Sequence, residues 1–210
     1  MNLKSKLFAG EKTNYRVPYD QEDAASILSR QLLEILPSTM TRPIVIVNIG
    51  TDRSTGDSLG PLIGSLLIKK GIDHLHVYGT LDDPVHAVNL EEKLAEIKKT
   101  HIFPYVIGID ACLGRLKNVG MITIGDGPVK PGAGVNKVLP PVGNIHMTGI
   151  VNVSGFMEFF VLQNTRLSLV MKMADTIASA LYEVDKHYSQ QRTFKAIEFK
   201  NRTMSFSKKG

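Results

Sequence analysis

A polar, glycine-rich loop between two apolar segments constrains the fold of this 210-residue chain more than any other stretch of its sequence. The loop spans residues 50–61, follows the apolar run at 44–47 and precedes an apolar, helix-like run at 62–68. A strand that leads through such a loop into a helix places the loop at the carboxyl edge of a sheet, where α/β proteins bind ligands and hold catalytic groups. Asp57, within this loop, is therefore the first candidate for a functional residue.

Strand-like and helix-like segments alternate through the first half of the chain. After an amphipathic helix at 21–36, we expect strands at 44–49, 74–78 and 103–109, and helices at 59–70 and 90–99. This β-α-β-α-β order predicts an α/β fold with a mostly parallel, twisted sheet that helices cover on both faces.

The second half of the chain departs from this alternation. The segment 112–115 is typical of a turn, and a strand at 119–124 then leads into a long loop at 125–143 that is rich in Gly and Pro. Long loops in compact domains are often functional. A last strand is expected at 145–153, followed by a long amphipathic helix that begins between residues 155 and 166.

The chain is expected to form one domain with short additions at each end. We expect an N-terminal extension at 1–20, a single α/β hydrolase-like domain at 21–190 and a basic C-terminal tail at 191–210.

Composition narrows the class of protein. Hydrophobic residues make up 43% of the chain, yet no stretch approaches the roughly 20 apolar residues of a membrane span, and no signal-like segment follows the first residues. The single cysteine, Cys112, excludes a disulfide framework within the chain. The net charge of +5 lies partly in the tail, so nucleic-acid binding is not expected. We expect a cytoplasmic protein that does not associate with membranes.

Two aspartates follow predicted parallel strands. Asp57 lies beyond the strand at 44–49, and Asp110 directly follows the strand at 103–109. Neighbouring parallel strands bring such residues to the same edge of the sheet. Two facing carboxyl groups raise the pKa of one of them and suit acid and base catalysis on water. The alternative for Asp57 is a structural role as a helix N-cap.

Four other residues are candidates for the site, and each has a structural alternative. His146 is either a base or metal ligand beside the two acids or a hydrogen-bonded structural histidine. Asp126 and Lys130, in the Gly- and Pro-rich loop, either contact substrate or face water. Cys112 suits apolar packing better than nucleophilic catalysis, because the sequence shows no Cys-His pattern of the kind that activates a thiol. The chain carries no P-loop lysine, dinucleotide fingerprint, zinc-binding cysteine pairs or Gly-x-Ser-x-Gly elbow.

Four sequence strings carry a resemblance to a known family. They lie at residues 50–61, 109–114, 130–135 and 163–167. Together they resemble the YyaC-type sporulation proteins of spore-forming bacteria, and the resemblance extends from about residue 42 to residue 181. The layout is also similar, more distantly, to the spore germination protease, an atypical aspartic endopeptidase that degrades small acid-soluble spore proteins, and to the hydrogenase maturation proteases.

The resemblance implies a phosphorylase/hydrolase-like fold, a three-layer α-β-α sandwich, and peptide-bond hydrolysis. Asp57 and Asp110 would be catalytic, with one ionised and the other protonated, and no cofactor would be needed. The residues expected to bind substrate are Gly132 and Gly134, which lie in the loop that the resemblance covers, together with Asp126 and Arg115.

The same resemblance implies the setting and leaves alternatives open. The substrate would be a protein or peptide, such as a small acid-soluble spore protein, in the forespore or mother cell, and the protein could be a homo-oligomer. As a maturation-type protease it would bind a divalent metal through Asp57, Asp110 and His146. A third hypothesis is a non-catalytic sporulation binding protein that retains the protease fold.

Overall fold

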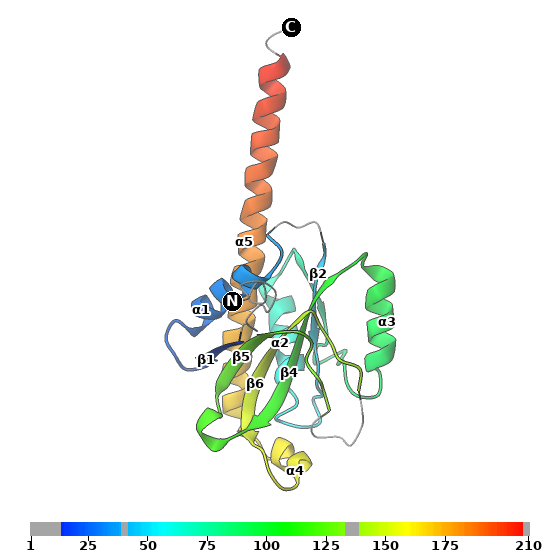
Figure 1. The fold of residues 1–210 in the computed structure, drawn as a ribbon, viewed down its shortest axis with the longest axis vertical. Helices are drawn as coiled ribbons and strands as arrows, with labels where there is room; N and C mark the ends of the chain where they lie inside the picture. Colours follow the sequence, from blue (N-terminus) through cyan, green and yellow to red (C-terminus); the bar gives the residue numbers. More distant parts are fainter. Residues whose placement is uncertain (1–13, 39–41, 133–138, 208–210) are drawn as a thin grey trace, which may run out of the picture.

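A six-stranded sheet with helices on both faces forms the core of the protein, as the computed structural model shows for residues 14–38, 42–132 and 139–207 (Figure 1). The strand order is β1-β5-β6-β4-β2-β3. Side chains are described up to residue 191. The elements in chain order are β1 (Asn14–Pro18), α1 (Ala24–Ile35), β2 (Ile44–Asn48), α2 (Leu59–Lys70), β3 (Leu75–Tyr78), α3 (Leu90–Thr100), β4 (Tyr105–Gly114), the short 3-10 helix η1 (Leu116–Asn118), β5 (Met121–Asp126), β6 (Ile145–Val153), α4 (Glu158–Gln163) and α5 (Leu167–Ser207).

The prediction of an α/β fold with a mostly parallel sheet is confirmed. Strand β2 pairs in parallel with β3 and β4, and β4 pairs in parallel with β6. The exceptions are β5, which is antiparallel to β6, and β1, which is antiparallel to β5. The twisted sheet therefore has a parallel half and an antiparallel half.

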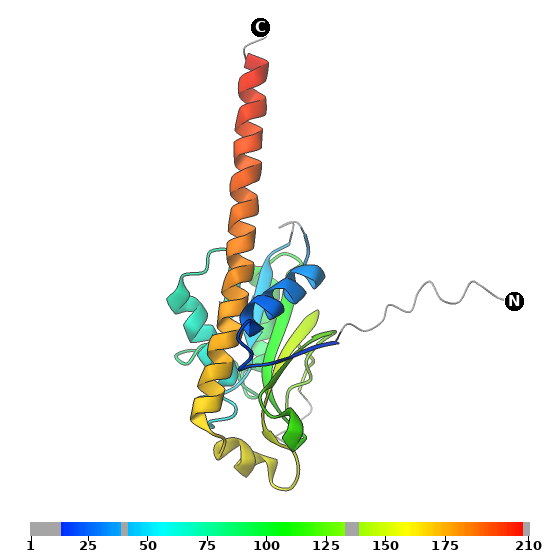
Figure 2. The same cartoon turned by 90° about the vertical axis from the view of Figure 1, so that its left-hand side faces the viewer.

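Two apolar cores, one on each face of the sheet, produce the three-layer arrangement. Residues such as Ile46 and Ile107 face the larger core, which also contains buried side chains of α1, α2 and α5. Val45 and Val47 face the smaller core together with Leu90 and Ile97 of α3. Strand β2 is buried on both faces, as expected for a central parallel strand. Figure 2 shows α5 running along the domain beside α1, with its later turns extending past the domain.

Three predicted boundaries differ from the structure. Residues 14–18, expected in the N-terminal extension, form β1 at the edge of the sheet. The expected turn at 112–115 was wrong in part, because β4 continues through Asp110 to Gly114 and pairs with β6. The expected long helix after β6 is divided into α4 and α5, and α5 continues through the expected tail to Ser207.

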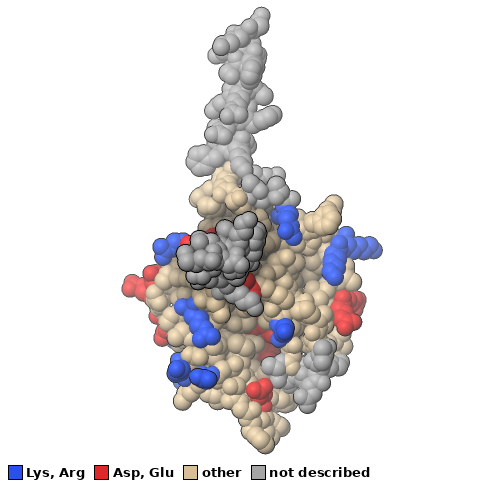
Figure 3. All heavy atoms as spheres, viewed as in Figure 1, with Lys and Arg blue, Asp and Glu red and all other residues tan. Residues whose placement is uncertain are grey.

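Charged side chains are spread over the surface without forming one large basic patch on the face seen in Figure 3, where Lys and Arg lie apart among neutral residues. None of the helices within the described ranges is long and apolar enough to cross a membrane.

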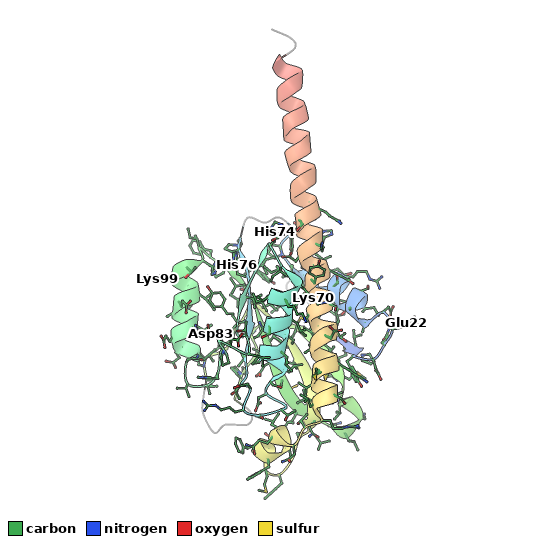
Figure 4. The ribbon with its side chains drawn as sticks, turned by 180° about the vertical axis from the view of Figure 1, so that it is seen from behind. Glu22, Lys70, His74, His76, Asp83 and Lys99 are labelled. Carbon is green, nitrogen blue, oxygen red and sulfur yellow. The ribbon has the colours of Figure 1, made fainter. Side chains whose placement is uncertain are left out.

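Helix α5 is tied to the sheet by a buried carboxylate. Asp185 accepts hydrogen bonds from the backbone N–H groups of Asp73, His74 and Leu75, at 3.1, 2.8 and 3.0 Å. Figure 4 shows His74 and Lys70 next to α5, where the Lys70 ammonium lies 5.7 Å from the centre of the Tyr182 ring. Asp185 thus fixes the start of β3 against the helix that covers the sheet.

Replacement of Asp185 should destabilise the protein strongly. Asp185→Ala would leave three backbone donors without their acceptor at a buried site, so we expect the free energy of unfolding to fall by about 3 kcal/mol. Urea denaturation followed by circular dichroism measures this change. Asp175→Ala removes a carboxylate from the exposed face of the same helix and serves as the control. Equal stability of the two variants would contradict this role for Asp185.

Candidate active site

The end of β2 lies beside the middle of β4, and this brings the two candidate aspartates together. Asn48 pairs with Ile109 in the parallel register, and the N–H of Ile49 donates to the carbonyl of Ile109 at 2.7 Å. The loop that follows β2 then folds back, because the N–H of Thr51 donates to the carbonyl of Asp57 at 3.2 Å. Asp110 lies one residue beyond Ile109. The register therefore fixes both acids at the carboxyl edge.

Two glycines let the loop at 50–58 pack tightly. A Cβ atom on Gly50, which has φ +149°, would lie 1.9 Å from the Asp57 carbonyl oxygen, and one on Gly60 would lie 2.2 Å from the Ile49 carbonyl oxygen. Neither backbone atom can move without moving the strand or the loop. These glycines let the start of α2 and the Asp57 segment approach the end of β2.

A cavity of about 670 Å³ lies at this edge, within the size range of ligand-binding sites. Both Asp57 and Asp110 line it. The other walls come from the loop after β3, the end of β4, the segment after β5 and helix α4. Its lining is largely apolar and includes Ile49, Pro84, Ala87, Val88, Leu113, Leu139, Phe159 and Leu162.

The surroundings of the two acids favour their protonated forms. Burial raises the pKa of Asp57 above its ordinary value. Burial and, second, the negative charge of Asp57 raise the pKa of Asp110 well above the ordinary value, while a hydrogen bond from the Ala111 backbone opposes this shift. Part of the Asp110 surface nevertheless remains accessible from the cavity. The charge of Asp57 thus disfavours a second ionised carboxylate at Asp110.

Asp57 is not the N-cap of α2. The residue at that position is Ser58, and its side chain makes no capping hydrogen bond. Ser54 lies close enough to Asp57 to favour the ionised carboxylate, although its buried hydroxyl has no formed hydrogen bond. The alternative prediction, that Asp57 is a helix N-cap, is therefore wrong.

Cys112 lines the cavity but is not activated as a nucleophile. Burial raises the pKa of its thiol to about 11, with a smaller contribution in the same direction from the charge of Asp110. A thiol with this pKa is almost entirely protonated near neutral pH, and the thiolate is the reactive form.

The other predicted site residues are only partly assembled around the two acids. Gly132 lines the cavity, whereas Gly134 lies outside the described residues. Asp126 lies at the end of β5 opposite Ile145, so the antiparallel pairing carries it to the other edge of the sheet. Arg115 is exposed at the start of η1 and does not line the cavity.

The structure does not bring His146 to the two acids, which corrects the three-residue metal site. Thr148, not His146, pairs with Asp110, and His146 lies two residues earlier in β6. Its Nδ1 lies 3.0 Å from the carbonyl oxygen of Gly127, and its ring packs against Gly125. Within the described part of the chain, no three His, Cys, Asp or Glu side chains are grouped so as to hold a metal ion. The structure therefore does not assemble the expected donor set of Asp57, Asp110 and His146.

Four cavity residues were not predicted as site residues. Ser54 and Gln163 lie in the sequence strings 50–61 and 163–167, whereas His86 and Phe159 reach the cavity from segments that no motif marked. Only the folded arrangement of the loop after β3 and helix α4 brings them to the site.

Comparison with known proteins establishes the family. A family model described as "Protein of unknown function (DUF1256)" matches residues 16–180. The chain belongs to this family. It is 54% identical over 194 residues to the "Uncharacterized protein YyaC" of Bacillus subtilis (strain 168), an alignment that covers 91% of this chain and 95% of the relative. The resemblance to YyaC-type proteins expected from the sequence is thus confirmed.

A solved structure with a similar arrangement is that of the [NiFe] hydrogenase maturation protease HycI from Thermococcus kodakarensis KOD1. It shares 17% sequence identity and a TM-score of 0.47, and the match covers 76% of this chain and 99% of that chain.

A side chain at position 50 should disrupt the loop that holds Asp57. Gly50→Ala places a Cβ against the Asp57 backbone, so we expect a loss of about 2 kcal/mol or more in unfolding free energy. Gly155→Ala is a matched control, because Gly155 has a similar φ of +159° but open space at the Cβ position. Thermal unfolding of both variants measures the difference. A similar small loss in both would show that the close approach at Gly50 has no consequence.

The raised pKa of Asp110 should make stability depend on pH. Because the pKa is higher in the folded protein than in the unfolded chain, the folded protein holds a proton that the unfolded chain has released, and stability falls as the pH rises through this interval. Asp110→Asn imitates the protonated acid and removes this loss, by about 1.4 kcal/mol for each pH unit between the two pKa values.

Urea unfolding from pH 3 to pH 9 tests this expectation. The two proteins should be equally stable below the pKa of the unfolded aspartate, and the variant should be more stable at higher pH. Asp52→Asn, an exposed position in the glycine-rich loop, controls for the loss of one negative charge. Parallel curves for wild type and Asp110→Asn would contradict a raised pKa.

Proposed function

We propose that this protein is an endopeptidase that hydrolyses peptide bonds with Asp57 and Asp110. The observation that carries the proposal is the pair of carboxyl groups that line one cavity, both with pKa values raised by burial and that of Asp110 raised further by the charge of Asp57. Strongly perturbed acids in a cleft are typical of catalytic sites. Keeping two acids in such surroundings opposes folding, which favours a functional reason for them.

The different surroundings of the two acids suggest their roles. Asp110 has the more strongly raised pKa, so it is the protonated member and the general acid. Asp57 is the ionised member and the general base, and the nearby Ser54 hydroxyl favours this state. A pair of acids with separated pKa values is what acid and base chemistry near neutral pH requires.

The first half of the reaction adds water to the peptide carbonyl. The Asp57 carboxylate takes a proton from water as the water oxygen forms a bond to the carbonyl carbon. Asp110 donates its proton to the carbonyl oxygen, which gives a neutral tetrahedral diol. No net charge develops on the substrate, which suits a largely apolar cavity.

The second half breaks the carbon–nitrogen bond. Asp57, now protonated, donates its proton to the leaving nitrogen, while Asp110, now ionised, takes a proton from one hydroxyl of the diol. The products are a carboxylic acid and an amine, and both aspartates return to their starting states. The cycle consumes one water molecule, and no step passes through a metal ion.

The biological setting is part of the proposal and comes from the resemblance to YyaC-type proteins. A role in sporulation or germination, in the forespore or mother cell, makes small acid-soluble spore proteins a natural first substrate. These proteins therefore belong in the assay together with a peptide library.

Loss of either acid should abolish hydrolysis. Asp57→Asn and Asp110→Asn each remove one proton-transfer group, so we expect kcat/KM to fall at least about 100-fold. The measurement is cleavage of spore proteins and of a fluorogenic peptide library, with products identified by mass spectrometry. Asp175→Asn, on the exposed face of α5, should cleave like the wild type.

Two results would reject the proposal. Full activity in both acid variants would show that the aspartates are not catalytic. A wild-type protein that binds spore proteins tightly but cleaves nothing would favour the non-catalytic binding protein instead.

A further inference from the structure

A patch of exposed apolar side chains lies beside the cavity on the segment that leads into α4. The side chains of Phe156, Met157, Phe159 and Phe160 are 95, 59, 50 and 52% exposed, respectively. We call these four residues the α4 apolar surface. Figure 1 shows α4 beyond the carboxyl end of β6, at the end of the molecule opposite the C-terminus. Bulky side chains gathered in the open in this way are typical of binding surfaces.

The exposure of this surface does not come from a loosely held backbone. The N–H of Gly56 donates to the Leu162 carbonyl at 2.8 Å, and the Asn152 side chain donates to the Val161 carbonyl and to the Thr165 hydroxyl, both at 3.2 Å. Leu162 itself is buried in the larger core. The inner side of α4 is thus fixed to the Asp57 loop and to β6.

The outer side of the same segment is held in one arrangement. Met157 adopts a left-handed backbone conformation with φ 58°, which is uncommon for a residue other than glycine. The rings of Phe159 and Phe160 make an edge-to-face contact, with centroids 5.7 Å apart. The apolar side chains are therefore directed outward by a defined backbone turn.

The α4 apolar surface is continuous with the cavity. Phe159 belongs to both, since it also lines the cavity that contains Asp57 and Asp110. Another cavity-lining residue, Val88, is 84% exposed and follows β3. In the sheet, β4 and β2 lie between β6 and β3, so the two acids lie between α4 and the segment containing Val88.

We propose that the α4 apolar surface binds an extended segment of the polypeptide substrate that carries bulky apolar side chains next to the scissile bond. The inference rests on the proposed peptidase function and names its substrate class. An extended chain that crosses the two acids continues from the cavity onto this surface, and Glu158 is the only charged residue within 156–160. The preferred substrate is thus an unfolded or exposed apolar stretch of protein.

Paired peptides test this substrate class. Fluorogenic peptides share one scissile segment and carry either a Phe-Leu-Phe or a Ser-Gln-Ser extension, placed in separate peptides on the amino or the carboxyl side. On one of the two sides we expect the wild-type kcat/KM to favour the apolar extension by at least about tenfold. In the double variant F156S/F160S this ratio should fall close to one.

A matched control separates this surface from general apolar exposure. Ile102 is 80% exposed and precedes β4 at its amino end, away from the cavity. Ile102→Ser should keep the wild-type preference. Urea denaturation of each variant confirms that it is folded under the assay conditions.

The outcomes distinguish this inference from the proposed function. Hydrolysis without an apolar preference, or with a preference that F156S/F160S retains, overturns the inference and leaves the peptidase proposal intact. If the wild type hydrolyses neither peptide, the peptidase proposal fails, and fluorescence anisotropy with the labelled apolar peptide decides. Weaker binding by F156S/F160S than by Ile102→Ser then supports the peptide-binding surface, and equal binding overturns it.

Two further measurements test other occupants of the surface. Sedimentation velocity that shows a wild-type dimer and a monomeric F156S/F160S variant assigns the surface to a second copy of the chain. Flotation with phosphatidylglycerol vesicles that depends on the same residues assigns it to a lipid bilayer. Either result overturns the inference.

Discussion

The parallel pairing of β2 with β4 is the constraint on which the rest of the site depends. It fixes Asn48, the last residue of β2, opposite Ile109, so the loop that follows β2 begins beside Asp110 of β4. The proximity of the two acids is therefore a property of the backbone register. This proximity does not depend on an attraction between the two side chains, which repel each other when both are ionised. The folded sheet places the two acids near each other, and apolar packing on both of its faces offsets the unfavourable electrostatic energy.

The sequence predicted the parallel half of the fold well and the antiparallel half poorly. Central strands such as β2 are apolar on both faces and are read easily from composition. Strand β1 is an edge strand with several partly exposed residues, so its pattern resembles that of an extension. The hydrophobic periodicity of β5 indicates a strand, but it carries no information about whether that strand runs parallel or antiparallel to its neighbours. The expected turn at 112–115 is strand, because β4 continues to Gly114 opposite β6, which carries the extra residue Val151 where the register shifts.

The same distinction explains which site residues were predicted. Asp57 follows β2, and Asp110 lies within the parallel strand β4, just past the point where β2 ends beside it, so the parallel pairing brings both to the cavity. Asp126 ends β5, and that strand runs the other way. His146 lies on a neighbouring strand, yet a displacement of two residues along β6 places it about 7 Å from the residue that pairs with Asp110. Register decides both cases, and a single sequence without its fold does not specify register.

The attachment of α4 to the Asp57 loop has a consequence for how this family can diversify. The acceptors in that attachment include the backbone carbonyls of Val161 and Leu162, so much of it is independent of side-chain identity. The outward residues of the same segment are largely exposed, so a substitution there removes little buried surface. Under the proposed function, substitutions in the α4 apolar surface would change which substrates bind while the Asp57 loop stays in place. Relatives with the same two aspartates would then differ in their targets through changes confined to this short segment.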